Sequence, residues 1–341
     1  MPTRVARTPP VAWESDMKSA IATGAVLIAS AASAEPLTIY APDYFASEWG
    51  PGPAIREAFE ASCGCEIAYV TGDLLPRLLL EGERTRADVV IGLNTDDAER
   101  ARRTGLFAPH EMDISDTDLP IDWTDPDFVP FNWGHTAFVY DTTRMDAPPQ
   151  SFRALVDAPD DAFTLAIQDP RSSVSGLALA LWVHAVFGDE AEAAWEGLAP
   201  KIVTVTQGWS ESYGLFTEGE VDMVLSYTTS PAYHIIAEGD DTKKAAIFPE
   251  GHYVMIESAG RIADSDQPEL AQAFLDFILS EEFQSIIPEG NWSLPVKLDP
   301  ARMPAGFAGL EMPETALIYS AEEAEALRDT VVAEFEAGMG R

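Results

Sequence analysis

Residues 128–140, FVPFNWGHTAFVY, constrain the fold of this chain more than any other segment. The run is apolar and aromatic, and it extends beyond a typical β-strand of about five or six residues. A run of this kind can pass from one lobe of a protein into another, and residues 246–262 are a second extended segment that can form the return crossing. We therefore expect two lobes, with lobe 1 formed by residues 35–137 and 252–341 and lobe 2 formed by residues 138–251.

Short apolar segments alternate with helical ones along the rest of the chain. The pattern predicts strands at residues 37–40, 65–70, 87–92, 164–167 and 221–225. It predicts helices at residues 54–61, 74–80, 150–157, 176–187, 268–280 and 320–338. This alternation is typical of an α/β architecture with mainly parallel sheets.

The formal net charge of −36 limits the partners of the chain. Such a charge repels nucleic acid and anionic membrane surfaces, so we expect neither as a partner. The acidity can gather a cationic ligand, or it can belong to a solvated surface adapted to salt. Hydrophobic residues make up 46% of the chain and include eight tryptophans, which is enough material for a folded core.

The amino terminus has the pattern of a secretory signal. Residues 1–16 show no core pattern, whereas Met17 opens the segment MKSAIATGAVLIASAASA, with one positive charge, an apolar stretch and a small-residue cleavage triplet. We expect Met17 to be a candidate start, cleavage to follow Ala34, and the mature protein to be exported. Residues 1–34 carry a net charge of +1, which leaves −37 for the remainder. A retained membrane anchor is the alternative.

Two cysteines, Cys63 and Cys65, are separated by one glycine. Export permits a disulfide between them, and two sulfurs alone do not form a metal site. A bridge across one residue closes a loop too small to constrain the unfolded chain much. We expect either a local bridge or two unreactive thiols.

The segment TQGWSESYGLF at residues 206–216 and the segment EGEVDMVLSYTTSPAYH at residues 218–234 hold the strongest binding signal. Trp209, Tyr227 and Tyr233 surround a short buried strand, and Ser230 before Pro231 predicts a helix start. Trp292 also lies in a polar context, EGNWS, rather than in an apolar stripe. Aromatic faces beside new helix amides form a cleft suited to a flat cationic ligand, although single aromatic residues more often belong to the core.

Two other positions are candidates for contact with a ligand. The segment DPRSSVSG at residues 169–176 can place successive amides and the Ser173 hydroxyl around an anion. The same geometry serves a helix cap without any ligand, and the sequence does not separate the two. Asp43, in the loop after the first strand, can receive an amine or can be a solvated loop residue.

The sequence gives little support for catalysis. The five histidines, at positions 110, 135, 184, 234 and 252, lack the spacing of a metal site. Ser173 lacks the glycine pattern of a nucleophile elbow, and the chain has no glycine-rich nucleotide loop. We therefore expect neither an enzyme nor a metal protein.

Several segments resemble those of periplasmic thiamine-binding proteins, the substrate-binding components of bacterial thiamine ABC transporters. The resemblance covers nearly all of residues 36–338 and is carried by DYFASEWGPGPAIREAFEASCGC, FVPFNWGHTAFVYD, QDPRSSVSGLALALW, VTVTQGWSESYGLFTEGEVDMVLSYTTSPAYH and IPEGNWSLPV. It implies a type II periplasmic-binding-protein fold, with two α/β lobes joined by a two-stranded hinge and the ligand between them. It also implies a monomer that needs no cofactor and delivers its ligand to a membrane permease.

The resemblance assigns roles to six residues. The ligand would be thiamine and also its mono- and diphosphate, with its rings flanked by Tyr233 and Trp292. Trp209 and Tyr227 would complete the pocket, Ser173 and nearby amides would bind the hydroxyl or phosphate end, and Asp43 would match a family aspartate. Two departures are visible. Pro42 stands where the family often has tyrosine, with Tyr44 as a candidate substitute. The loop holding Asp73 is shorter, so the resemblance leaves open whether Asp73 replaces a family acidic residue that binds the aminopyrimidine.

Three functions compete at this stage. The first is a binding protein for thiamine. The second is a receptor for another cation, either a polyamine or ferric iron, although iron binders typically use adjacent tyrosines and Tyr227 and Tyr233 are six positions apart. The third is a thiamine-degrading enzyme, which requires a cysteine in the pocket, and both cysteines lie outside the predicted cleft.

Overall fold

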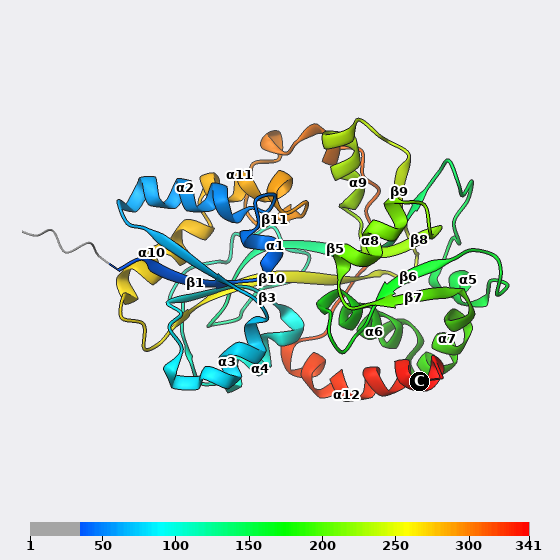
Figure 1. Cartoon of the computed structure of the whole chain (residues 1–341), viewed down its shortest axis with the longest axis horizontal. Coiled ribbons are helices and arrows are strands. Elements are labelled where there is room, and N and C mark those ends of the chain that lie inside the picture. The colour runs from blue at the N-terminus through cyan, green and yellow to red at the C-terminus, as the bar shows by residue number, and fades with distance from the viewer. Residues whose placement is uncertain (1–34, 341) are drawn as a thin grey trace, which may run out of the picture. The chain divides into compact units, whose positions relative to one another are not determined.

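The computed structural model describes residues 35–340, which form an α/β protein (Figure 1). Its strands follow one path in the order β2-β1-β3-β10-β5-β8-β6-β7. The strands are β1 Leu37–Ala41, β2 Ile67–Thr71, β3 Val89–Asn94, β4 Phe107–Ala108, β5 Val129–Asp141, β6 Leu165–Gln168, β7 Ile202–Thr206, β8 Met223–Tyr227, β9 Lys243–Ala246, β10 His252–Ile262, β11 Leu294–Pro295 and β12 Ala316–Leu317. Strands β1, β2 and β3 are parallel at one end of the path, as are β6, β7 and β8 at the other. Mainly parallel sheets were expected, and each end of the path fits that expectation.

Helices cover both ends of this path. They are α1 Asp43–Ala46, α2 Gly52–Cys63, α3 Leu74–Glu81, α4 Thr95–Arg103, α5 Phe152–Asp157, α6 Val174–Phe187, α7 Ala191–Leu198, α8 Trp209–Thr217, α9 Ser230–Tyr233, α10 Pro268–Ile278, α11 Glu281–Gly290 and α12 Ala321–Gly338. The predicted starts of α3, α9, α10 and α12 agree with the structure to within one residue, whereas α7, α8 and α11 were not predicted. Ser173, Ser280 and Ser320 each cap a helix with their side chains, and Ser320 forms a full capping box with Glu323.

Strands β5 and β10 form the predicted two-stranded hinge. They pair antiparallel, with Gly134 opposite Met255 and Asn132 opposite Glu257. The first part of β5 pairs with β10, and its second part, from Thr136 onward, pairs with β8 and β9. One continuous strand therefore takes part in both lobes. The predicted return segment at 246–262 is shorter in the structure, since β10 begins only at His252, after a turn at Gly251 whose φ is 98°.

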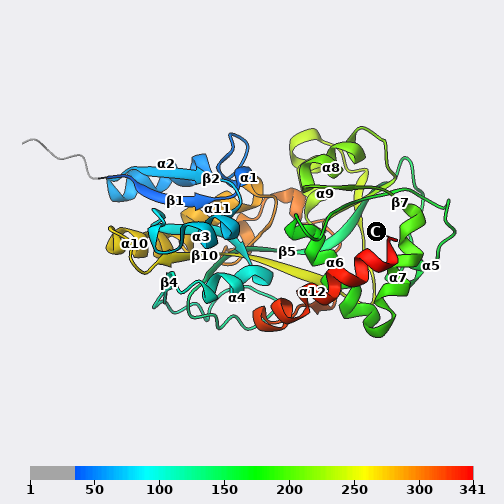
Figure 2. The same cartoon turned by 60° about the horizontal axis from the view of Figure 1, so that its bottom comes forward.

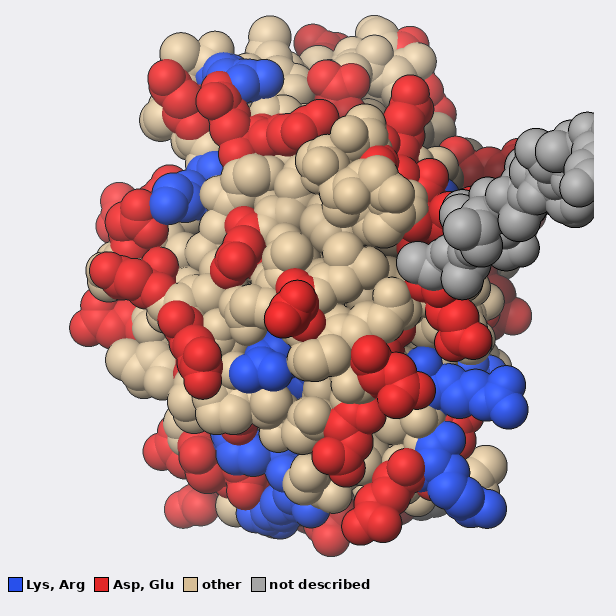
Figure 3. Space-filling model, turned by 90° about the vertical axis from the view of Figure 1, so that its left-hand side faces the viewer, with Lys and Arg blue, Asp and Glu red and all other residues tan. Residues whose placement is uncertain are grey.

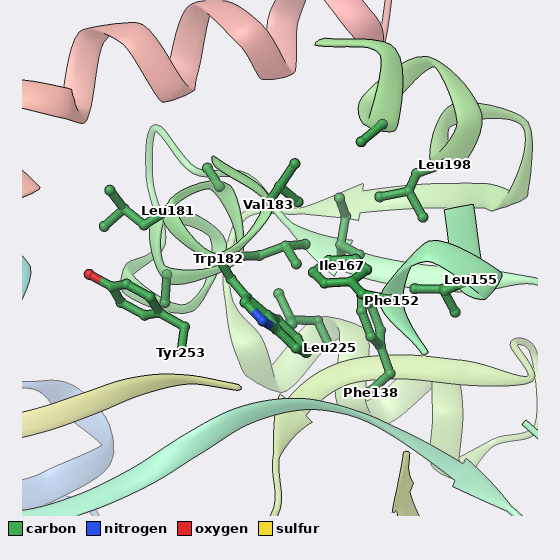
Figure 4. Close-up of a cluster of buried hydrophobic side chains, with 14 of the residues drawn as sticks. Phe138, Phe152, Leu155, Ile167, Leu181, Trp182, Val183, Leu198, Leu225 and Tyr253 are labelled. Carbon is green, nitrogen blue, oxygen red and sulfur yellow. The ribbon is translucent and has the colours of Figure 1, made fainter. Parts of the chain in front are cut away.

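Each lobe has its own hydrophobic core. The lobe 2 core packs Phe138, Phe152 and Trp182 with neighbouring aliphatic side chains (Figure 4). A second cluster, in lobe 1, packs Phe131 and Phe274 with the β1 and β3 side chains. Two separate cores allow two lobes to move as units about the strands that connect them.

The last helix, α12, contacts both lobes. It packs on α6 and α7, and its Phe335 ring lies 5.0 Å from the Trp195 ring of α7. It also packs on α4, where Arg328 binds Asp97 at 2.5 Å (Figure 2). The lobe boundaries given above, which assign residues 252–341 to lobe 1, stay a prediction.

The structure settles the state of the two cysteines. Cys63 and Cys65 are joined in a disulfide at the end of α2, where Gly64 adopts a φ of 65°. The expected signal segment and its cleavage point lie outside the described residues. Within residues 35–340, we find no helix with the length and apolar character needed to cross a membrane.

Candidate ligand-binding site

Tyr227 and Ser175 bring two of the predicted segments together where the hinge meets lobe 2. Tyr227 ends β8, and its hydroxyl is hydrogen-bonded to the Ser175 hydroxyl at 2.8 Å and lies 3.4 Å from the Met255 sulfur. Its ring lies over Gly134, because a Cβ built there would be 3.9 Å from the Tyr227 ring. Burial raises the pKa of Tyr227 to about 12, so the phenol stays protonated and can donate. The aromatic segment and the helix-start segment therefore meet on one face of the hinge.

Ser173 is the N-cap of α6. Its side chain accepts a hydrogen bond from the Gly176 amide at 3.4 Å. The nearby Arg171 is bound to Asp169 and Glu336, so its charge is directed away from the helix start. Gly176 is required here, because a Cβ would lie 2.6 Å from the Gln168 carbonyl oxygen. These contacts are those of a helix cap, and anion binding at Ser173 stays a prediction.

Trp209 is the first residue of α8 and is fixed to the end of β8. Its indole nitrogen donates to the Ser226 hydroxyl at 2.8 Å, and its ring stacks on Tyr213 with centroids 4.5 Å apart. Ser226 is in turn hydrogen-bonded to Ser230 at 2.7 Å, which ties β8 to the start of α9. Trp209 remains half-buried, so part of its ring is accessible.

Tyr233 and Trp292 come from distant parts of the chain and meet in space. Their ring centroids are 5.2 Å apart and their planes are inclined by 81°. A ligand ring between two faces needs roughly 7 Å between them, twice the usual carbon contact distance. The two rings thus contact each other edge to face, and the predicted sandwich requires them to separate.

Asp43 is exposed at the start of α1, and its neighbour Tyr44 points inward. The Tyr44 hydroxyl donates to Glu257 of β10. Pro42, which replaces the family tyrosine, lies against Gly92, where a Cβ would be 2.6 Å from the proline ring. Asp73 is also exposed, at the N-cap position of α3. Tyr44 is therefore connected to the candidate site by its hydrogen bond to Glu257. The roles of Asp43 and Asp73 stay predictions.

Glu257 is a site residue that the sequence analysis missed. Its carboxylate also accepts hydrogen bonds from the side-chain amides of Asn132 at 2.6 Å and Asn291 at 2.9 Å. Burial raises the pKa of Glu257 to about 7, and the hydrogen bond from Asn291 opposes this rise. A carboxylate directly after the apolar run YVMI of β10 was the available signal.

Further polar groups lie near the hinge without partners. Among the described residues, six buried side-chain atoms near this region have no hydrogen-bond partner: Trp133 Nε1, His135 Nδ1, Thr136 Oγ1, Thr228 Oγ1, Thr95 Oγ1 and Asp96 Oδ2. Unpaired buried polar atoms are costly and call for an explanation such as water or a ligand. His135 and Thr136 interrupt the apolar run of β5, which was the signal for them.

Asp96 and His135 carry shifted pKa values in this region. Burial raises the pKa of Asp96 to about 7, and its Oδ1 accepts a hydrogen bond from the Tyr253 hydroxyl at 2.8 Å. Burial lowers the pKa of His135 to about 4, with a further lowering from His252. His135 is therefore neutral at physiological pH.

The described surface is largely acidic (Figure 3) and has a hollow away from the predicted residues. In residues 35–340, we find no group of three or more His, Cys, Asp or Glu side chains arranged to hold an ion. Acidic side chains spread over much of the face in Figure 3, with Lys and Arg in smaller groups. One hollow of about 320 Å³ is lined by Tyr40, Leu80, Glu81, Arg84 and Arg86, and by none of the six predicted residues.

Comparisons with known proteins give one consistent result. The model of the family described as bacterial extracellular solute-binding protein matches residues 54–296. The thiamine-binding periplasmic protein of Escherichia coli (strain K12) is 48% identical over 309 residues, which cover 89% of this chain and 94% of that protein. The thiamine-binding periplasmic protein of Brucella abortus biovar 1 (strain 9-941) is 44% identical over 319 residues, covering 92% and 95% of the two chains.

Solved structures agree with these sequence relationships. A structure described as a periplasmic thiamin binding protein has a TM-score of 0.85 at 48% identity and covers 89% of this chain and 96% of its own. Iron-bound HitA from Pseudomonas aeruginosa has a TM-score of 0.66 at 24% identity, which shows a common fold alone.

Proposed function

Because this chain belongs to the family of bacterial extracellular solute-binding proteins, we propose that it captures thiamine between its two lobes and delivers it to an ABC permease. The observation that carries the proposal is the 48% identity, over nearly the whole chain, to a protein named for thiamine binding. The chain is periplasmic, as these relatives are. It acts as a monomer, and thiamine mono- and diphosphate are further ligands in this proposal.

Physical chemistry supports thiamine as the ligand. Its thiazolium ring carries a permanent positive charge, and an aromatic face near such a cation contributes about 0.5–2 kcal/mol. In the proposal, Trp209, Tyr227, Tyr233 and Trp292 contact the ligand rings. The Ser173 end of α6 receives the hydroxyl or phosphate end, and Asp43 receives the amino group of the pyrimidine.

Binding requires the hinge to open and close. Tyr233 and Trp292 contact each other edge to face, so a ligand ring enters between them only after the lobes separate. Closure then adds contacts that exist only in the bound state, which is how a ligand shifts a two-state equilibrium. Small-angle scattering should show compaction when thiamine saturates the protein. Identical scattering with and without bound thiamine would contradict hinge closure.

Isothermal titration tests the proposed ligand most directly. We expect tight one-to-one binding of thiamine and no binding of spermidine, with the two phosphates titrated in parallel. Tryptophan fluorescence should be quenched on binding, and the Trp292→Ala variant should lose most of that signal. Heat from spermidine but not from thiamine would overturn the proposed ligand in favour of a polyamine.

The proposed role is binding without chemical change. The two cysteines are joined to each other in a disulfide at the end of α2, so neither is a free nucleophile for a thiamine-degrading reaction. Incubation of thiamine with the protein and a nucleophilic amine, followed by product analysis, should return the thiamine intact. Consumption of thiamine would establish an enzyme instead.

A further inference from the structure

Glu257 collects three hydrogen bonds at the hinge. It lies on β10 opposite Asn132 of β5, where the pairing register of the two strands shifts between Glu257 and Ser258. Oε1 accepts from the Tyr44 hydroxyl, and Oε2 accepts from the amides of Asn132 at 2.6 Å and Asn291 at 2.9 Å. Three donors therefore fix both oxygens of one half-buried carboxylate.

The donors connect the hinge to two separate segments of the proposed site. Tyr44 follows Asp43 in α1, and Asn291 precedes Trp292 at the end of α11. Asn132 lies on the other hinge strand. Glu257 is thus the common partner of the segment that carries Asp43, the segment that carries Trp292, and the hinge itself.

Trp292 needs such an anchor because its backbone is strained. Its φ is 52°, in the left-handed region that residues other than glycine rarely adopt. Conformations of this kind persist only where the surrounding structure holds them. The hydrogen bond from Asn291 to Glu257 holds the residue directly before the strained position.

We propose that Glu257 is a positioning residue for ligand binding: it holds Trp292 and the Asp43 segment on the hinge, in place to meet the ligand. This inference rests on the proposed function, because that function assigns ligand contacts to Trp292 and Asp43. Glu257 acts through its three donors, and its role is to accept hydrogen bonds. A role as the counter-charge of a cationic ligand is the competing explanation.

A glutamine at this position separates the two explanations. Its carbonyl oxygen can still accept from both asparagine amides, and its NH₂ group can donate to the Tyr44 hydroxyl, which also accepts. The Glu257→Gln variant should therefore bind thiamine within about three-fold of the parent affinity. The Glu257→Ala variant loses all three acceptor contacts and should bind at least about ten-fold more weakly, as expected for the loss of several hydrogen bonds. Equal losses in the two variants would overturn the proposal and assign the counter-charge role.

Asn291→Ala provides a second variant in case Glu257→Ala does not fold. Asn291→Ala removes the donor nearest Trp292. The affinity lost in this variant should not add to the affinity lost in Glu257→Ala when the two are combined, because both substitutions break the same connection. Additive losses would contradict the proposed route through Asn291.

Asp88→Ala is the matched control: Asp88 is also a buried lobe 1 carboxylate, and it accepts from the Thr38 amide at 2.8 Å and the Ser265 hydroxyl at 2.6 Å. It should lower stability without changing affinity.

A measurement without ligand keeps this inference separate from the proposed function. The emission of Trp292 is obtained as the difference between each protein and its Trp292→Phe partner. Glu257→Ala should shift this emission to longer wavelength, because the indole is no longer held, whereas Glu257→Gln and Asp88→Ala should leave it unchanged. Absence of thiamine binding in the parent would refute the proposed function alone. An unshifted emission in Glu257→Ala would refute the positioning role.

Discussion

Trp182 and Trp292 have the same side chain in two opposite environments. Trp182 is fully buried in the lobe 2 core, with its ring 4.5 Å from Phe152 and its nitrogen donating to the Gly251 carbonyl at 2.9 Å. Trp292 is half-buried, has a strained backbone, and contacts Tyr233, which comes from a distant segment of the chain. The core ring has its polar atom satisfied and is packed on all sides, whereas the site ring keeps an accessible face. The comparison therefore assigns stability to Trp182, whereas binding by Trp292 stays part of the proposed function.

Trp182→Ala should have the largest effect among the variants that test this comparison. Removing a fully buried indole leaves a cavity among Phe138, Phe152 and Phe248, which should cost about 3–5 kcal/mol of unfolding free energy. Urea denaturation monitored by circular dichroism measures the loss. Thiamine affinity, measured where the variant is folded, should be nearly unchanged. A large loss of affinity with normal stability would reverse the roles of the two tryptophans.

Asp96→Asn extends the comparison from the buried aromatic rings to the buried polar groups near the hinge. A folded pKa raised from 3.8 to about 7 means that stability is fully present below the unfolded pKa and is lost as the pH rises towards 7. Asparagine does not ionise and can still accept from Tyr253, so the variant should be more stable than the parent at pH 8, by up to about 4 kcal/mol. The gain should vanish near pH 4. Thermal unfolding of both proteins across this range tests the sign, and a gain that grows towards pH 4 would contradict it.

Trp292→Ala tests the other half of the comparison. Loss of one aromatic face beside a cation should weaken thiamine binding by about 2- to 30-fold, from about 0.5–2 kcal/mol. The free energy of unfolding should change by less than about 1 kcal/mol, because the ring is half-buried and its backbone is strained. Titration calorimetry and urea denaturation on the same preparation compare the two quantities. An unfolding loss as large as that of Trp182→Ala would place Trp292 in the core.

The double variant Cys63→Ser, Cys65→Ser should have the smallest effect. The bridge closes a loop across a single residue, so it removes little entropy from the unfolded chain, less than about 2 kcal/mol in free energy. The bridge also lies at the end of α2 and belongs neither to the Trp182 cluster nor to the pair of Trp292 and Tyr233. Affinity should be unchanged, and urea denaturation should show a small loss. A loss of thiamine binding would give this bridge a role that its position does not suggest.

Local signals explain how much of the fold was predictable from the sequence. Residues 128–140 predicted the hinge strand β5 because a long apolar run has few other uses, and Ser230 before Pro231 predicted the start of α9. The edges of elements were less predictable, as at residues 246–251, where the apolar Phe248 is buried outside a strand. Burial dictates an apolar side chain in both cases, so hydrophobicity alone does not separate strand from loop.

The candidate site was less predictable than the fold. Trp209 and Trp292 were identified because each stands in a polar context, and the structure brings Trp292 to Tyr233. Glu257 was missed because its three donors come from positions 44, 132 and 291, and no local pattern connects such distant residues. The sandwich of Tyr233 and Trp292 around a ligand stays a prediction for the same reason: it depends on how far the lobes separate.

Helix α12 has a consequence for how the medium controls access to the cleft. It packs on α6 and α7 of lobe 2, and its Arg328 and Glu325 form ion pairs with Asp97, Arg100 and Arg103 of α4. A rotation of one lobe against the other must disturb either the packing of α12 on α6 and α7 or these ion pairs with α4. Of the two, the ion pairs are partly exposed and are weakened by dissolved salt. If opening separates α12 from α4, the rate of ligand uptake should therefore rise with salinity. If α12 moves with lobe 1, as its predicted assignment has it, salinity should leave that rate unchanged.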